Sequence, residues 1–147
     1  MTTLARGIIA VMKISHVNPD GLHKNPAFSQ AVVVEGPAKM VYVGGQNAVN
    51  AEGAIVGGDL ATQSEQALKN VLSVLSALGA TQENVVKLTI YVVQGGALAQ
   101  AFAAAQKVWG RHATAISVLV VAGLANPEFL VEVDAVAAIP HSPTQLG

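Results

Sequence analysis

Two carboxylates near the end of the chain are the residues best placed, by type and spacing, to do chemistry. Glu132 and Asp134 stand two positions apart in the otherwise largely apolar run 129–138. Residues two apart in a strand point to the same face, so both side chains lie together if this run is a strand. The ordinary interpretation is an exposed polar face. The sharper one is a partly buried carboxylate that positions water or accepts a proton.

The other residues that could carry chemistry give weaker signals. The four histidines lack the spacing of metal ligands, so we expect loop or surface positions for them and no metal site. Gly44-Gly45-Gln46 follows a β-rich run but lacks both the dinucleotide-binding glycine pattern and the lysine of a P-loop. A close approach of the backbone to a ligand or a neighbouring chain is the better interpretation, and no cofactor is indicated. The histidines are His16, His23, His112 and His141.

The elements that must position these residues are strands and two helices. One helix is predicted after Asp59, a suitable N-cap, because apolar residues recur at helical spacing until Gly79 ends it. A second helix is predicted at about residues 97–109. Six strands are predicted, at residues 12–16, 28–34, 40–44, 85–93, 115–124 and 129–138.

The order of these elements, β, β, β, α, β, α, β, β, indicates one α+β domain. The turn at residues 35–38 suits a hairpin between the strands that flank it, and Pro140 is expected to end the last strand. Two helices can cover only one face of a six-stranded sheet. The run 115–124, predicted to be a central strand, is apolar on both faces, so the face without helices is expected to meet another subunit.

The composition favours the same conclusion. Hydrophobic residues make up 52% of the chain and charged residues only 12%, about half of the roughly 25% found in ordinary soluble domains. So few charges cannot cover the surface of a small domain, which favours self-association.

The composition also excludes several classes of function. A net charge of −1 without a basic cluster argues against nucleic-acid binding. Residues 1–12 fit neither a secretory signal nor a membrane span, so no membrane partner is expected. The absence of cysteine excludes disulfides and thiolate sites, and we expect a cytoplasmic protein.

Four segments, taken together, resemble the signatures of the Rid family, the reactive-intermediate deaminases also called YjgF-like or translation-initiation-inhibitor-like proteins. The resemblance runs in order over about residues 13–139. It implies a chorismate-mutase-like α+β fold, a mixed six-stranded sheet with two helices on one face, and a homotrimer with a central sheet-lined core and clefts between subunits. It also implies a single domain over residues 1–147, with 1–12 and 140–147 as extensions. The four segments are 25–31 (NPAFSQA), 41–46 (VYVGGQ), 84–92 (NVVKLTIYV) and 129–137 (FLVEVDAVA).

The resemblance also implies roles for individual residues. The family's deaminases hydrolyse enamines and imines derived from amino acids to a keto acid and ammonia. By position, Glu132 matches the glutamate that positions water, and Gly44 and Gly45 match the floor of the cleft. The remaining positions implied to bind the substrate are Phe28, Gly96, Ile116 and Val118.

Three of these positions depart from the family's pattern, and one of them is Gly96, which stands where many members have an asparagine. Ile116 stands where the deaminases have an arginine that clamps the substrate carboxylate, and Phe28 replaces a tyrosine and so lacks its hydroxyl. The lost charge-assisted contact is worth about 1.5 to 3 kcal/mol, which predicts a less charged and more apolar ligand. Replacement of the arginine by Arg111 or His112 is an open alternative.

The leading hypothesis is therefore a small-molecule-binding Rid-type protein that hydrolyses an enamine or imine with water positioned by Glu132. The alternative is a non-catalytic ligand-binding or chaperone-like trimer, so the sequence leaves open whether the protein is an enzyme. A third hypothesis, ribonuclease activity, is disfavoured by the charge balance. The expected partners are other copies of the chain and a small molecule at the subunit interfaces.

Overall fold

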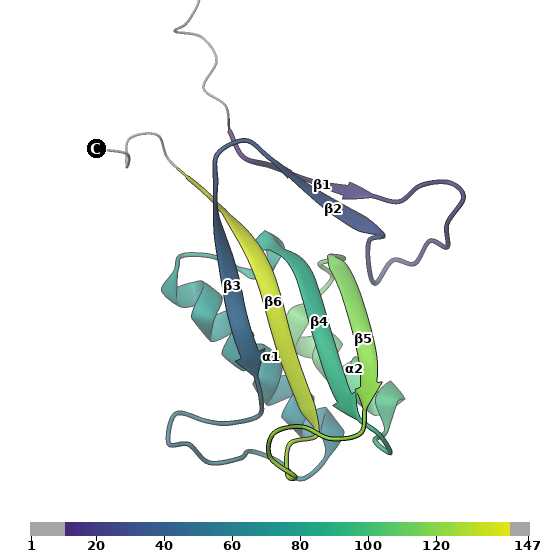
Figure 1. The fold of residues 1–147 in the computed structure, drawn as a ribbon, viewed down its shortest axis with the longest axis vertical. Helices are drawn as coiled ribbons and strands as arrows, with labels where there is room; N and C mark the ends of the chain where they lie inside the picture. The colour runs from purple at the N-terminus through teal and green to yellow at the C-terminus, as the bar shows by residue number, and fades with distance from the viewer. Residues whose placement is uncertain (1–10, 142–147) are drawn as a thin grey trace, which may run out of the picture.

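The computed structural model describes residues 11–141 and contains, over that range, the six strands and two α-helices that the sequence predicts (Figure 1). Most of the two predicted extensions, residues 1–10 and 142–147, lies outside the described residues. The strands are β1 (Lys13–Val17), β2 (Ala31–Glu35), β3 (Ala38–Gln46), β4 (Val85–Val93), β5 (Ala115–Val121) and β6 (Val131–Pro140). The helices are α1 (Leu60–Ala77) and α2 (Leu98–Trp109), with a short 3₁₀ turn, η2 (Gln82–Asn84), before β4.

The strands form two sheets, which corrects the expectation of one six-stranded sheet. β1 and β2 pair antiparallel, and the other four strands follow the order β3-β6-β4-β5. The larger sheet is mixed, as predicted, because β4 and β5 run parallel while β6 is antiparallel to both of its neighbours. An isolated bridge between Ser29 and Ala115 links the two sheets, and the β1–β2 pair projects from one end of the larger sheet (Figure 1).

Two finer predictions about the strands are wrong. Segment 35–38 does turn, with Gly36 at a φ of 82°, but β2 pairs with β1 and β3 pairs with β6 instead of forming a hairpin. The run 115–124 supplies the edge strand β5, not a central one. Pro140, by contrast, ends β6 as expected, because it is the last residue of the strand, a position where its missing N–H costs little. Turn residues indicate where a chain reverses, whereas strand partners depend on contacts far apart in sequence.

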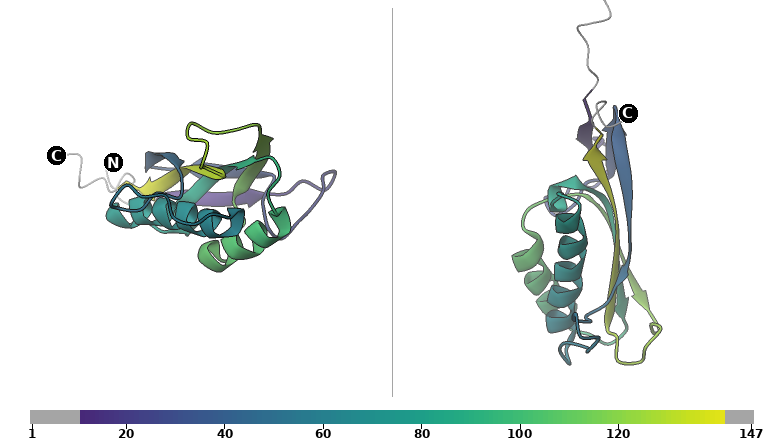
Figure 2. Two further views of the ribbon diagram at one scale, coloured as in Figure 1. Left: turned by 90° about the horizontal axis from the view of Figure 1, so that it is seen from below. Right: turned by 90° about the vertical axis from the view of Figure 1, so that its left-hand side faces the viewer.

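Both helices pack on one face of the larger sheet and leave the other face open, as the right-hand view of Figure 2 shows. This confirms the predicted one-sided arrangement. The core between helices and sheet is apolar and draws on strands β3, β4 and β6. Its buried members include Val43, Leu68, Val71, Leu75, Leu88, Val92, Val131, Val133, Ala135 and Ala137. Neither helix in the described range combines the length and the apolar character needed to cross a membrane.

Helix α1 begins and ends where the sequence predicts. Oδ1 of Asp59 accepts the backbone N–H of Thr62 at 2.7 Å, and this hydrogen bond to the charged carboxylate lowers the pKa of Asp59. Gly79 follows the C-cap with a φ of 71°, a conformation that favours glycine.

A buried glutamine ties α1 to the segment that enters β6. Gln63 is 1% exposed, and its Nε2 donates to the carbonyls of Gly57 at 3.1 Å and Glu128 at 3.0 Å. Its Oε1 accepts the N–H of Leu130 at 2.9 Å. Because buried polar groups are costly unless they are paired, this side chain fixes the backbone two residues before Glu132.

Candidate functional site

The open face of the larger sheet carries the two predicted carboxylates. Val131, Val133 and Ala135 of β6 are buried beneath the helices, so the residues between them, Glu132 and Asp134, point to the opposite side. The prediction that both share a face is confirmed. Both side chains are half-buried in the single subunit, which fits the sharper of the two interpretations.

Glu132 lies against the glycine pair of β3. A Cβ built on Gly45 would lie 2.7 Å from Oε2 and 2.8 Å from Cδ of Glu132, so any other residue there would displace the carboxylate. Gly44 and Gly45 occupy a register shift in β3 between Val43 and Gln46, where a bulge bends the strand. Glu132 and the glycine pair are therefore neighbours on the open face of the sheet.

An asparagine that the sequence analysis missed completes the surroundings of Glu132. Nδ2 of Asn47 donates to Oε1 of Glu132 at 3.2 Å and to the carbonyl of Val131 at 3.0 Å. Asn47 directly follows β3, and its position after the Gly44-Gly45-Gln46 run was the signal available in the sequence.

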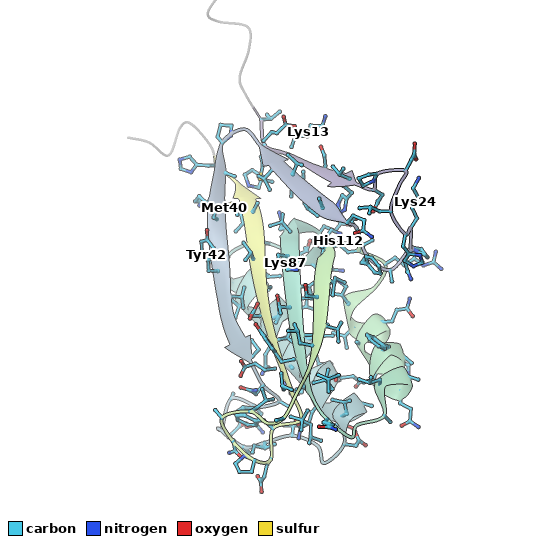
Figure 3. All side chains as sticks on the ribbon, turned by 45° about the vertical axis from the view of Figure 1, so that its right-hand side comes forward. Lys13, Lys24, Met40, Tyr42, Lys87 and His112 are labelled. Carbon is cyan, nitrogen blue, oxygen red and sulfur yellow. The ribbon has the colours of Figure 1, made fainter. Side chains whose placement is uncertain are left out.

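Further polar side chains of β4 and β5 share the open face. Tyr91 donates its hydroxyl proton to Oδ2 of Asp134 at 3.1 Å, and this hydrogen bond, strengthened by the nearby negative charge, raises the pKa of Tyr91. Nζ of Lys87, labelled in Figure 3, donates to Oγ of Ser117 at 2.7 Å. The alternation of Lys87, Thr89 and Tyr91 along β4 was the sequence signal for this polar row.

Ile116 and Val118 lie on the other face of the sheet. Ile116 pairs with the buried Leu88 and packs against the core, while Val118, 40% exposed, lines a small apolar hollow beside Phe102 of α2. β4 separates β5 from β6, a lateral distance of about 10 Å. One subunit therefore does not bring these two residues together with Glu132.

Phe28 and Gly96 occupy two further regions. Phe28 lies in the connection from β1 to β2, with its ring 6.4 Å from that of His23. Gly96 lies between β4 and α2, where an added Cβ would meet Leu60 at 2.6 Å, and it lines a cavity of about 330 Å³ next to the start of α1. The predicted site residues are thus dispersed over the subunit, apart from Glu132 and the glycine pair.

The two proposed replacements for the missing arginine differ in their freedom to move. Nε2 of His112 donates to the carbonyl of Val85 at 2.9 Å, and the ring meets that of His16 edge to face at 5.5 Å. Figure 3 places His112 at the end of the sheet near the β1–β2 pair. Arg111 precedes His112 in the connection from α2 to β5, and its side chain is exposed. Across residues 11–141, no three histidine, aspartate or glutamate side chains gather in a way that could hold a metal ion.

The whole of this arrangement is similar to that of known proteins. A solved structure from Yersinia pestis, described as a protein of unknown function of the conserved Rid family, YyfB, superposes with a TM-score of 0.74 and 34% identity, covering 86% of this chain and 98% of its own. A solved putative endoribonuclease from Thermotoga maritima superposes with a TM-score of 0.63 and 28% identity, covering 83% and 91%.

Curated relatives match over shorter lengths. The human 2-iminobutanoate/2-iminopropanoate deaminase is 34% identical over 92 residues, 61% of this chain, and the rat protein of the same name is 42% identical over 65 residues, 44% of this chain. The chain spans 59% and 45% of the lengths of these two relatives. The model of the family described as endoribonuclease L-PSP matches residues 21–139. This match covers most of the residues that the structure describes. The chain therefore belongs to the endoribonuclease L-PSP family, that is, to the Rid proteins.

Proposed function

We propose that this protein hydrolyses the C=N bond of a small, largely uncharged imine, or of the imine tautomer of an enamine, in clefts formed between the subunits of a homotrimer. Glu132 is the residue that acts on water. The proposal draws support from the family to which the chain belongs and from curated relatives named as deaminases of 2-iminobutanoate and 2-iminopropanoate.

The placement of the Glu132 carboxylate is the observation that carries this proposal. It is half-buried on the open face, it is held through Oε1 by Asn47, and Gly45 leaves room beside Oε2. A carboxylate in such a position can accept a proton from water within reach of a bound ligand.

The reaction requires water and one group that moves protons. Glu132 accepts a proton as the water oxygen bonds to the carbon of C=N, and the π electron pair moves to nitrogen. The carboxyl group then returns its proton to that nitrogen. The resulting carbinolamine expels ammonia and forms the carbonyl group, so C=N and water become C=O and ammonia, with no cofactor required.

The ligand is expected to lack a carboxylate, or to depend little on one. Ile116 offers no charge where the family's deaminases have an arginine, and Val118 beside it is also apolar. Phe28 offers a ring without a hydroxyl group. Such walls suit an apolar ligand with few polar groups.

A second subunit is needed for Ile116, Val118 and Glu132 to line one cleft. Ile116 and Val118 lie on the opposite face of the sheet from Glu132 within one chain. The open face and the β5 edge also expose large apolar side chains, including Tyr42 at 77%, Leu119 at 44% and Val120 at 58%. Burying these by self-association would remove them from water and also cover the unpaired edge of β5.

The direct test is release of ammonia and of the carbonyl product from freshly generated imines, half of them with a carboxylate and half without. We expect turnover to favour the imines without a carboxylate. General base catalysis typically contributes about 10²- to 10⁴-fold to a rate, so turnover should fall at least about 100-fold in Glu132→Gln. Equal turnover in the variant would exclude the role of Glu132.

The second candidate function is ligand binding without turnover. The departures at Ile116 and Phe28 favour it, because both remove polar groups that act on the substrate in the family's deaminases. It predicts that the imines bind, as measured by calorimetry, while no ammonia is released by a protein that is fully folded and assembled.

A further inference from the structure

The side-chain amide of Asn47 has its orientation fixed by two acceptors. Nδ2 lies 3.0 Å from the carbonyl oxygen of Val131 and 3.2 Å from Oε1 of Glu132. Neither acceptor carries a proton when the carboxylate is charged, so the nitrogen, not the oxygen, of the amide must face them. Asn47 therefore donates to the Glu132 carboxylate and to the backbone next to it at the same time.

Asn47 is itself held by helix α1. Nδ2 of Asn70 donates to the carbonyls of Asn47 and Val49, each at 2.9 Å. Oδ1 of Asn70 in turn accepts from Nε2 of Gln66, one helical turn earlier, at 2.9 Å. The loop that presents Asn47 is thus fixed to a rigid element by two hydrogen bonds from Asn70, whose side chain is itself held by Gln66, as a preorganised donor requires.

The two oxygens of the carboxylate have different surroundings. Oε1 accepts from Asn47. Oε2 lies over Gly45, whose missing Cβ would come within 2.7 Å of it. Among residues 11–141, Oε2 accepts no hydrogen bond from a protein group. The other ionisable groups near Glu132 on this face are Tyr91, opposite it on β4, and Asp134 on its own strand.

We propose that Asn47 is a positioning residue that fixes Oε1 of Glu132 and so makes Oε2 the oxygen that accepts the proton from water. The catalytic consequence rests on the proposed function, but the hydrogen bond and its effect on the carboxyl group do not. The water loses its proton to Oε2 as its oxygen bonds to the carbon of C=N, and the same proton later leaves Oε2 for the nitrogen. Asn47 keeps its own protons throughout.

Two substitutions of Asn47 test this role in the assembled protein. Asn47→Ala removes the donor, and we expect kcat to fall about 10-fold while KM changes less than about twofold. Asn47→Asp has nearly the same shape but places a second carboxylate beside Glu132. Because like charges disfavour the ionised form, the acid limb of the pH–rate profile should move to higher pH.

A matched control lies in the same loop. Oδ1 of Asn50 accepts the backbone N–H groups of Glu52 and Ala54, and aspartate keeps this acceptor. Asn50→Asp therefore adds the same charge without touching Glu132, and its pH–rate profile should match that of the native protein. An equal displacement of the acid limb in both aspartate variants would overturn the proposal.

A measurement that does not need turnover separates this inference from the proposed function. In protein labelled with ¹³C at the glutamate carboxyl carbons, the Glu132 signal is the one missing from Glu132→Gln. Its titration midpoint should be higher in Asn47→Asp than in the native protein and in Asn50→Asp. A higher midpoint without imine turnover supports the positioning role and contradicts the proposed function. Unchanged midpoints contradict the positioning role even if imines are hydrolysed.

The native chain provides a further test that does not depend on the folding of any Asn47 variant. The side-chain ¹⁵N–H signals of Asn47 should shift with pH at the same midpoint as the Glu132 carboxyl carbon. The same signals should stay unchanged over this pH range in Glu132→Gln. If the chemical shifts of the Asn47 side chain do not change as Glu132 titrates, the hydrogen bond is refuted and the proposal with it.

Discussion

The two faces of the four-stranded sheet are built from the same strands but differ in chemistry. The covered face of β6 presents Val131, Val133 and Ala135, which are at most 2% exposed beneath the helices. One residue along, the open face presents Glu132 and Asp134, which are half-buried and hydrogen-bonded to Asn47 and Tyr91 respectively. Alternation along a single strand thus separates the side chains that form the core from the polar side chains of the proposed site.

We therefore expect stability and the proposed function to respond to different substitutions. A substitution on the covered face acts on the free energy of unfolding, because tightly packed cores tolerate little change in volume or charge. A substitution on the open face should leave the single subunit folded, with at most a small change in stability, and act mainly on assembly or on catalysis. Substitutions on the two faces test that separation.

The largest effect is expected from a charge on the covered face. Val133 is 1% exposed, and Val133→Lys would bury an unpaired ammonium group at a cost of several kcal/mol. Domains of this size have only about 5 to 15 kcal/mol of stability, so we expect no cooperative thermal transition by circular dichroism. A variant that melts within a few degrees of the native protein would contradict the assignment of the faces.

The next effect comes from the buried amide between α1 and β6. Gln63→Met keeps the approximate shape but removes three hydrogen bonds and leaves the N–H of Leu130 unpaired. We expect a loss of about 2 to 4 kcal/mol, since each unpaired buried group costs about 1 to 3 kcal/mol. Urea denaturation measures this loss. A change below 0.5 kcal/mol, roughly the effect of an ordinary surface substitution, would show that Gln63 has no such role.

Sequence periodicity predicted the elements of the fold but not their pairing. The start of α1 at Asp59, its end before Gly79 and the full extent of β4 follow from local signals, namely a capping side chain, a glycine and a run of β-branched residues. The partner of β2 and the edge position of β5 depend on contacts between distant parts of the chain, which a local pattern does not encode.

The candidate site was predictable in part for the same reason. The spacing of Glu132 and Asp134 fixed their common face, and the resemblance to a family pointed to Gly44 and Gly45. Asn47 was missed because its role depends on a loop held by Asn70 of α1, which lies 23 residues further along the chain. The remaining predicted positions, Phe28, Gly96, Ile116 and Val118, are not gathered within one chain, and the cleft between subunits that would join them is a proposal that no local pattern encodes.

A smaller effect on the fold, but a large one on assembly, is expected on the open face. Leu119 is 44% exposed opposite Tyr91 on β4, and Leu119→Lys should leave the subunit folded while it prevents association. Light scattering should then give the 15.0 kDa subunit mass in place of three times that value for the native protein. Leu78, 48% exposed at the end of α1, is the matched control, and Leu78→Lys should keep the native mass.

If both lysine variants associate as the native protein does, the open face does not take part in self-association. If the native protein is itself a monomer, the proposal of clefts between subunits fails.

The smallest effect is expected from the hydroxyl group of Tyr91. Its raised pKa, caused first by the hydrogen bond to Asp134, means that it stabilises the fold fully below the unfolded pKa of about 10 and loses this contribution as pH rises further. The stability difference between the native protein and Tyr91→Phe should be constant from about pH 6 to 9 and shrink above about pH 10. Denaturant titrations across this range measure it, and a difference that grows with pH would contradict the assigned hydrogen bond.

The central claim is that the open face carries the chemistry, through Glu132. Its most direct test is ammonia release from carboxylate-free imines by the native protein and by Glu132→Gln, with Val136→Ala, another half-buried open-face position on β6, as the control. We predict turnover by the native protein and the control, and a loss of at least about 100-fold in Glu132→Gln with its melting temperature and assembly unchanged. Turnover by Glu132→Gln at the native rate would contradict the claim that Glu132 carries the chemistry.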